Sequence, residues 1–248
     1  MDPNALINLS EATPELVIKA IESFSITARG LQVEIGPSEV GMACQRCVCR
    51  KLAGIDKTQI TGSWRAQLGT YVHAGLEEEF ASRYSADQVI TEQRLQIHDY
   101  KSLHLAGSCD AFFPRFGTGL GGLVGDWKIV GDDTLESVAK GNLKHQYFIQ
   151  GQLYGLGWER LGFEVGDITI FFLPANRGNL SRDAVPISFR YDPTVAAVAL
   201  AKIERYIDLA EEIGWEELLR RTPTEPGCLS CKSYEVHDNP VNDLLLRK

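Results

Sequence analysis

The segment LVGDWKIV, residues 123–130, places Asp126 and Lys128 two positions apart in a run of residues that favour strands. In a β-strand alternate side chains point to the same face, so these two are predicted to project together while Trp127 points to the other face. A lone pair of this kind is usually a solvent-exposed ion pair of small energetic value. The Gly-rich stretch GTGLGG separates this segment from GSCDAFF and predicts an antiparallel hairpin, which would put Asp110 on the strand beside Asp126.

Two carboxylates and one ammonium group on neighbouring strands predict a site for a divalent cation. Hard oxygen ligands suit Mg²⁺ or Mn²⁺, which proteins commonly hold with one or two carboxylates together with phosphate oxygens. Such a cation polarises a phosphoryl oxygen and lowers the pKa of a water molecule, while Lys128 can orient the water or stabilise the developing negative charge. Asp110, Asp126 and Lys128 therefore favour hydrolysis of a phosphodiester bond.

A predicted helix at 64–84 carries two more polar side chains that suit such a site. His73 and Glu77 are one helical turn apart and share a face. His73 is a candidate third metal ligand, and Glu77 a candidate outer-shell or second-metal carboxylate. A packed histidine and a surface glutamate are the alternative interpretations.

A second predicted helix, at 143–161, carries a polar stripe. Gln146, Gln150 and Tyr154 recur every four positions and so lie along one face. Their amide and phenol groups can hydrogen-bond phosphates, bases or catalytic side chains. The alternative is a solvent-exposed outer face of a helix that covers the sheet.

The cysteines form two C-x-x-C pairs, CQRC (Cys44 and Cys47) and CLSC (Cys228 and Cys231). Four thiolates can surround one tetrahedral zinc ion or an iron–sulfur cluster. A metal held by both pairs would join the segment 36–52 to the segment 223–240 and close a very long loop. The two other cysteines are interpreted as ordinary thiols: Cys49 and Cys109.

Length and composition indicate one domain, 1–248, because no Gly/Ser-rich or Pro-rich linker divides the chain. The sequence shows neither an export signal nor an apolar run long enough for a membrane span, so a cytoplasmic protein without membrane contacts is expected. The net charge of -8 argues against nonspecific wrapping of nucleic acid by the whole surface. Basic residues at 46–65 favour either a local basic groove or a solvated face: Arg46, Arg50, Lys51, Lys57 and Arg65.

The order of predicted elements indicates an α/β (α+β) fold with a central mixed sheet flanked by helices. Helices are expected at 14–28, at the cysteine segment after Ser38, and at 64–84, 143–161 and 193–221. Strands are expected at 88–99, 103–116, 121–130, 167–175 and 184–191. Residues 131–142, GDDTLESVAKGN, are interpreted as a loop.

Four motifs in order, GTYVHAGLE, GSCDAFF, GDWK and Gln150-x-x-x-Tyr154, resemble the RecB-like branch of the PD-(D/E)XK nuclease superfamily. That branch includes the CRISPR-associated adaptation exonucleases and related phage exonucleases. The resemblance spans most of the chain and implies a restriction-endonuclease-like core. It also implies a DNA exonuclease dependent on Mg²⁺ or Mn²⁺. Such an enzyme would act in recombination, replication or repair, with DNA and other recombination or replication proteins as partners, in the host cytoplasm if phage-encoded.

The resemblance also implies roles for single residues. Asp110 and Asp126 would bind the metal, and Lys128 would act at the nucleophilic water. His73 and the backbone carbonyl of Trp127 would complete the coordination.

Gln150 and Tyr154 would, by the same resemblance, support DNA binding and the geometry of the site. Family members vary at the position of Glu77. Two alternative functions remain open: a catalytically silent DNA-binding subunit of a recombination complex, and a site-specific endonuclease, which needs base recognition that the sequence does not disclose.

Some relatives carry an iron–sulfur cluster that joins one N-terminal cysteine to three near the C-terminus. Cys44, Cys228 and Cys231 match three of those positions, whereas the fourth position holds His237. The fourth ligand is therefore either His237 or Cys47. The favoured interpretation is a [4Fe–4S] cluster bound by Cys44, Cys47, Cys228 and Cys231, with Zn²⁺ as the alternative.

Overall fold

A computed structural model describes residues 17–18, 35–55, 64–115, 121–232 and 234. Its centre is one five-stranded sheet with the order β1-β2-β3-β4-β5. The strands are β1 (Ile90–Tyr100), β2 (Leu103–Phe113), β3 (Gly122–Val130), β4 (Val165–Pro174) and β5 (Val185–Arg190). Only β3 and β4 pair in parallel, and the other neighbours are antiparallel. The predicted mixed sheet is confirmed. The helix expected at 14–28 lies outside the described residues except at 17–18.

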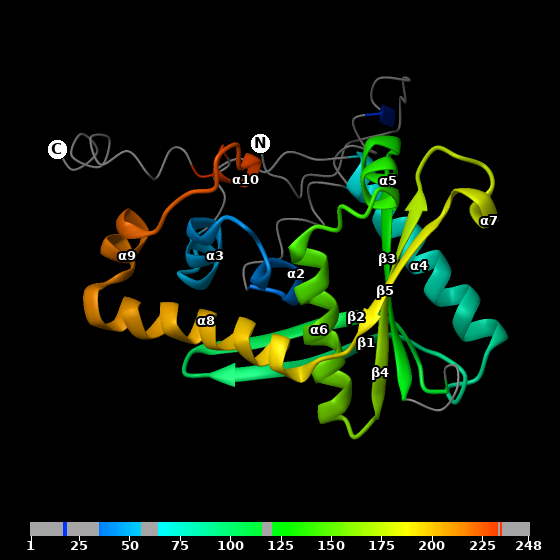
Figure 1. The fold of residues 1–248 in the computed structure, drawn as a ribbon, viewed down its shortest axis with the longest axis horizontal. Helices are drawn as coiled ribbons and strands as arrows, with labels where there is room; N and C mark the ends of the chain where they lie inside the picture. The colour runs from blue at the N-terminus through cyan, green and yellow to red at the C-terminus, as the bar shows by residue number, and fades with distance from the viewer. Residues whose placement is uncertain (1–16, 19–34, 56–63, 116–120, 233, 235–248) are drawn as a thin grey trace.

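Helices cover both faces of the sheet. Figure 1 shows α4 on one side of the strands and α6 with α8 on the other. The helices are α2 (Pro37–Val40), α3 (Gln45–Leu52), α4 (Trp64–Arg83), α5 (Asp132–Ala139), α6 (His145–Arg160), α7 (Leu180–Asp183), α8 (Pro193–Ile213), α9 (Trp215–Arg221) and α10 (Leu229–Lys232). The connection that makes β3 and β4 parallel runs through α5 and α6, as a crossover between parallel strands requires.

Alternate side chains of β3 point to opposite faces of the sheet and pack into different cores. Trp127 points towards α4, where its ring stacks on Phe80 with centroids 5.9 Å apart and also contacts Phe171. On the α6 face the apolar core includes Phe112 of β2, stacked on Trp158 at 4.3 Å. Each face therefore has its own apolar core, and the side chains of β3 that neighbour Trp127 must lie on the α6 side.

Glycines let α6 approach the sheet closely. A Cβ on Gly151 would lie 2.6 Å from the side chain of Ile168, and one on Gly155 would overlap the ring of Tyr191. Since helix glycines are otherwise unfavourable, this approach explains their presence in a buried helix. Gln150, beside Gly151, is held against β3 as a result.

The structure corrects two expectations from the sequence. Residues 132–139 form α5 and not a loop, because Leu135 and Val138 bury one helical face and the aspartates occupy its first turn. The predicted helix 193–221 is divided into α8 and α9 at Gly214, which has φ 83°. Gly214 adopts this left-handed conformation without the steric cost that other residues would incur.

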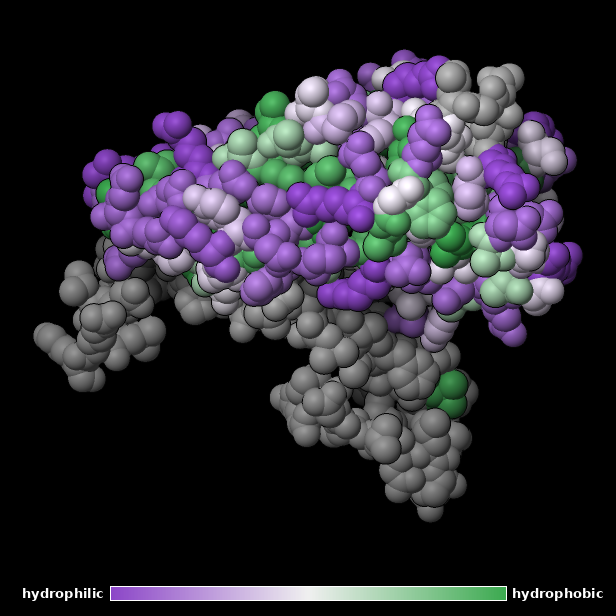
Figure 2. Space-filling view, turned by 90° about the horizontal axis from the view of Figure 1, so that it is seen from below, coloured by the Kyte–Doolittle hydropathy of each residue, from purple (hydrophilic) through white to green (hydrophobic). Residues whose placement is uncertain are grey.

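The surface seen from below is hydrophilic over most of its area, with small groups of hydrophobic residues between the polar ones (Figure 2). Among the helices that the structure describes, none is both long and apolar enough to cross a membrane.

Candidate metal-binding active site

The site lies where β2 diverges from β3. The two strands pair only at three positions, from Ala111 opposite Gly125 to Phe113 opposite Leu123. One residue further along, the side chain of Asp110 takes the place of a backbone partner, because its Oδ2 accepts a hydrogen bond of 2.6 Å from the backbone N–H of Trp127. This bond fixes the Asp110 carboxylate beside the segment that carries Asp126 and Lys128.

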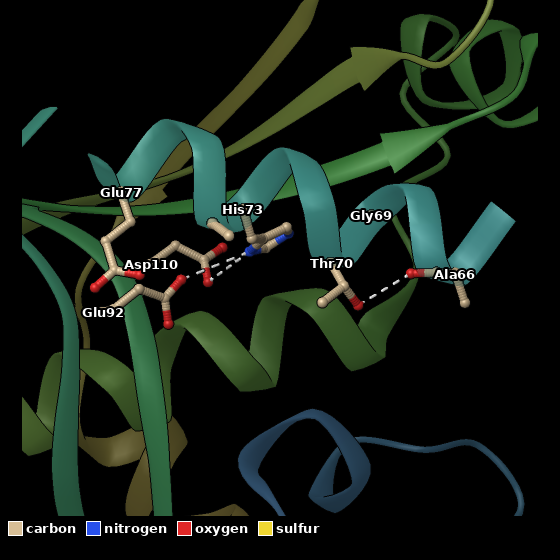
Figure 3. A pocket seen from close by; sticks show the side chains of 8 residues that line it. Ala66, Gly69, Thr70, His73, Glu77, Glu92 and Asp110 are labelled. Carbon is tan, nitrogen blue, oxygen red and sulfur yellow. Dashed lines mark hydrogen bonds and ion pairs between the residues drawn. The ribbon is translucent and has the colours of Figure 1, made fainter. Parts of the chain in front are cut away.

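Asp110 also belongs to a group of possible metal ligands. His73 Nδ1 of α4 lies 3.3 Å from Asp110 Oδ1 and 3.8 Å from Glu92 Oε1 of β1. One ligand atom from each of these three residues lies within 4.8 Å of the others. Figure 3 shows the three side chains converging at the wall of a cavity of about 500 Å³. One imidazole and two carboxylates form a donor set that can hold a divalent cation.

Small and polar residues of α4 form the rest of the cavity wall: Ala66, Gly69, Thr70, Ala74 and Glu77. Glu77 is exposed and lies one turn from His73, on the same side of the helix (Figure 3). It is not part of the three-residue ligand group among the described residues. Because the α4 side chains facing the cavity are mostly small, space remains open in front of His73.

A second buried group adjoins the first. Asp126 is 0% exposed, and its Oδ2 lies 2.5 Å from Lys128 Nζ. Its Oδ1 accepts a hydrogen bond of 2.9 Å from Gln150 Nε2, which also donates to the Tyr154 hydroxyl at 3.5 Å. Asp126 and Lys128 therefore share a face, as the strand alternation predicts, and Gln150 and Tyr154 of α6 complete their surroundings.

One acceptor atom in this group has no partner among the described residues: Gln150 Oε1 is buried without a hydrogen bond. Asp126 Oδ2, by contrast, is paired with the Lys128 ammonium at 2.5 Å. A buried acceptor without a donor is costly, so Gln150 Oε1 favours a further positive or hydrogen-bonding group at this place.

Burial and the neighbouring charges together set the pKa values of the ionisable side chains in the site. Burial raises the pKa of Asp126 to about 6, although Lys128 opposes the shift. Burial alone would lower the pKa of Lys128, but Asp126 and Asp110 outweigh it and raise that pKa. In the same way, burial opposes protonation of His73, but Asp110 and Glu92 raise its pKa to about 10. Without a metal, both cations of the site are therefore protonated at neutral pH.

Glu92 is the site residue that sequence reasoning missed. Thr91 pairs with Ala111 and Gln93 with Cys109, so Glu92 lies opposite Asp110 in the register of the β1–β2 hairpin. Its φ of 47° is unusual for a residue other than glycine and costs backbone energy, a feature that clusters at functional sites. The only available signal was an acidic residue in a predicted strand, and its partner could not be known without the register.

Other expected residues lie elsewhere. Gln146 donates to the backbone carbonyl of Ser38 in α2 and so does not extend the polar stripe to the site.

The basic segment does not form an open groove in its described part. Arg46 donates to the carbonyl of Thr222, Arg50 is buried, and Lys51 pairs with Glu39. Arg65 is exposed and packs beside Gly131 at the end of β3. Lys57 lies outside the described residues.

The four cysteines of the C-x-x-C pairs come together at the other side of the molecule. All four sulfur atoms lie within 4.8 Å of one another. They join α3 to α10, which lie beside α9 and apart from α4 in Figure 1. The predicted connection between the N-terminal and C-terminal segments is confirmed. Cys49 and Cys109 are buried elsewhere, and His237 lies outside the described residues.

No protein-family model and no curated protein sequence matches this chain. Among solved structures, LHK-Exo in complex with dAMP is 17% identical over 80% of this chain and 96% of its own, with a TM-score of 0.51. LHK-Exo is an alkaline exonuclease from Laribacter hongkongensis. A phage-related exonuclease from Haemophilus somnus is 13% identical over 72% of this chain and 95% of its own, with a TM-score of 0.48.

The comparison with LHK-Exo identifies the fold. The described chain has the fold of that exonuclease. The mixed sheet flanked by helices that the sequence predicts is part of this fold.

Proposed function

We propose that this protein is a DNA nuclease, and specifically an exonuclease, that hydrolyses phosphodiester bonds with Mg²⁺ or Mn²⁺. The observation that carries the proposal is the bond from the Trp127 N–H to Asp110, which brings a histidine and two carboxylates next to the Asp126–Lys128 pair. The fold shared with LHK-Exo supports it, since that exonuclease was crystallised with a deoxynucleotide, dAMP.

In this proposal His73, Asp110 and Asp126 hold the metal, with Glu92 as an added ligand and the Trp127 carbonyl beside them. When bound, the divalent ion would supply the positive charge that activates a water and offsets charge on the phosphate. The protein positions both reactants: the cavity admits the DNA strand, and Gln150 and Tyr154 keep Asp126 oriented. The exposed Glu77 borders the cavity and would contact the cations that accompany the strand.

Lys128 has the properties of a hydrogen-bond donor and not of a base. Its raised pKa keeps the ammonium protonated at neutral and moderately alkaline pH. The ammonium can therefore donate to the attacking water or to the phosphoryl oxygen on which charge develops, and it loses no proton in the step.

The proposal is tested by incubating the protein with end-labelled linear single-stranded DNA, linear double-stranded DNA and a closed circle, with Mn²⁺ or with EDTA. Shortening of linear DNA only, and only with metal, is the expected result. Cleavage of the circle at fixed positions would instead indicate a site-specific endonuclease. Binding without any cleavage would indicate a catalytically silent DNA-binding subunit.

Metal affinity is expected to rise with pH. His73 is protonated below its raised pKa of about 10, so Nδ1 must lose a proton before it can bind a metal. One released proton corresponds to an affinity that rises about tenfold per pH unit below that pKa. Calorimetry of Mn²⁺ binding at pH 7.5 and 8.5, in buffers of different ionisation enthalpy, measures the affinity at each pH and the number of protons released. A His73→Asn control should bind more weakly and release no proton, and proton-independent binding in the unsubstituted protein would contradict the assignment of His73.

We also propose that residues 1–248 form one nuclease domain, whose N-terminal and C-terminal segments are joined by a metal at the four cysteines. The proposed enzyme is phage-encoded and serves recombination, replication or repair of DNA.

A further inference from the structure

The cysteine group offers less room than the iron–sulfur cluster implied by the sequence resemblance requires. Cys44 Sγ lies 3.5 Å from Cys231 Sγ, and Cys47 Sγ lies 3.5 Å from Cys231 Sγ and 3.8 Å from Cys228 Sγ. All six distances among the four sulfurs stay within 4.8 Å. The four atoms therefore surround a space of single-atom size.

These distances match one tetrahedral ion. Zinc binds thiolates at about 2.3 Å, which places the sulfurs of a regular tetrahedron about 3.8 Å apart. In a [4Fe–4S] cluster each cysteine binds a different iron, so the cysteine sulfurs lie about 6 Å apart. In a [2Fe–2S] cluster the sulfurs on opposite irons are also separated beyond the observed limit. The resemblance and the sulfur geometry thus disagree, and the geometry describes this chain's own residues.

The surroundings of the sulfurs indicate a structural site. Cys44 is the N-cap of α3 and Cys47 lies in its first turn, while Cys228 immediately precedes α10 and Cys231 lies within it. Apolar side chains of Met42, Ile55 and Tyr234 pack around them. Four protein ligands leave no open position for a substrate, which is the coordination typical of structural zinc.

A buried cation accompanies the four thiols. Arg50 is 2% exposed, lies with its guanidinium 4.7 Å from the ring centroid of Tyr234, and points Nη1 towards Cys47 Sγ at 4.0 Å. Zinc with four thiolates carries a net charge of -2, and a buried charge of that size requires compensation. Arg50 supplies a positive charge at the correct place and acts on the site as a positioning residue.

We infer that Cys44, Cys47, Cys228 and Cys231 bind one zinc ion, which fastens α3 to the C-terminal segment, with Arg50 compensating its charge. The inference is independent of the proposed nuclease function. Zinc here takes no part in hydrolysis, so the ion that supports cleavage and the ion at the cysteines are chemically distinct and separately measurable.

The test uses the full chain, purified under argon from cells supplied with both iron and zinc. Elemental and sulfide analysis should give one zinc per chain, no sulfide and a colourless protein. Exchange with Co²⁺ should give the intense visible bands of a tetrahedral thiolate site. Four irons with sulfide, a single iron, or no metal at all would each overturn the inference.

Single substitutions test which side chains bind the zinc ion. Arg50→Met should lower zinc affinity by about 10-fold, within the range of about 10–100-fold that is typical of a substitution next to the metal ligands. Cys231→Ser removes a ligand and should lower the affinity by more than that range. Cys49→Ser is the matched control, because this buried thiol lies on α3 but faces Thr222 at 3.9 Å. Unchanged affinity in Cys231→Ser, or equal loss in Cys49→Ser, would contradict the ligand set. If Cys231→Ser does not fold, the stoichiometry and the cobalt spectrum of the unsubstituted protein decide.

Discussion

Replacing Lys128 with alanine is expected to lower the proposed rate of DNA hydrolysis by about 10²–10³-fold, the usual loss when one donor to developing negative charge is removed. The ammonium lies 2.5 Å from Asp126 and is held over the ring of Tyr147 at 5.6 Å, so no neighbouring side chain can take its place without rearrangement. The loss should fall on kcat, because the ammonium interacts most strongly with the transition state. Single-turnover digestion of end-labelled linear DNA with Mn²⁺ measures it.

The matched control is Lys140→Ala, an exposed lysine at the end of α5. It removes the same charge from the surface and should leave the rate unchanged. Because Lys128→Ala also leaves Asp126 buried without its cation, thermal unfolding must show that the variant is folded at the assay temperature. Activity of a folded Lys128→Ala protein equal to that of the control would exclude the proposed mechanism.

Replacing Asp110 with asparagine would remove a proposed metal ligand while keeping the shape of the side chain. The amide oxygen can still accept the hydrogen bond from the Trp127 N–H, so the join between β2 and β3 should persist. The substitution removes the negative charge that faces His73, however. The attraction between this carboxylate and the proposed metal ion is lost with it. We expect activity to fall by at least about 10²-fold and Mn²⁺ affinity to fall with it.

A second readout separates this electrostatic effect from misfolding. Asp110 raises the pKa of His73, so in metal-free Asp110→Asn that pKa should move down from about 10. NMR titration of the His73 ring measures the shift. The control is Asp99→Asn, an exposed aspartate near the turn of the β1–β2 hairpin. An unchanged His73 titration, or full activity with Mn²⁺, would contradict the assigned role of Asp110.

The sequence predicts the parts of the site that depend on local periodicity. Alternation along β3 is enough to place Asp126 and Lys128 on one face and Trp127 on the other, and the structure has this arrangement. The helical repeat places Gln150 and Tyr154 together, which the bond between them confirms.

The parts that depend on register and backbone strain could not be predicted. Glu92 meets Asp110 only through the pairing of β1 with β2, and its left-handed φ has no signature in a strand sequence. The sequence predicts a loop at 131–142, yet Gly131 and the two aspartates that follow it form the N-terminal end of α5. Pattern alone also leaves the fourth ligand of the cysteine site open, whereas the structure brings the Cys47 sulfur within 4.8 Å of those of Cys44, Cys228 and Cys231.

The short pairing between β2 and β3 divides the sheet into two parts that are joined by three residue pairs. One part is the long β1–β2 hairpin and the other is the β3–β4–β5 unit, and Asp110 and Asp126 lie in different parts. A cation bound by both aspartates would fix the angle between the two parts of the sheet, and loss of the cation would allow that angle to vary. In the proposed nuclease, occupancy of the metal site would therefore restrict movement between the two parts of the sheet, beside the cavity proposed to admit DNA.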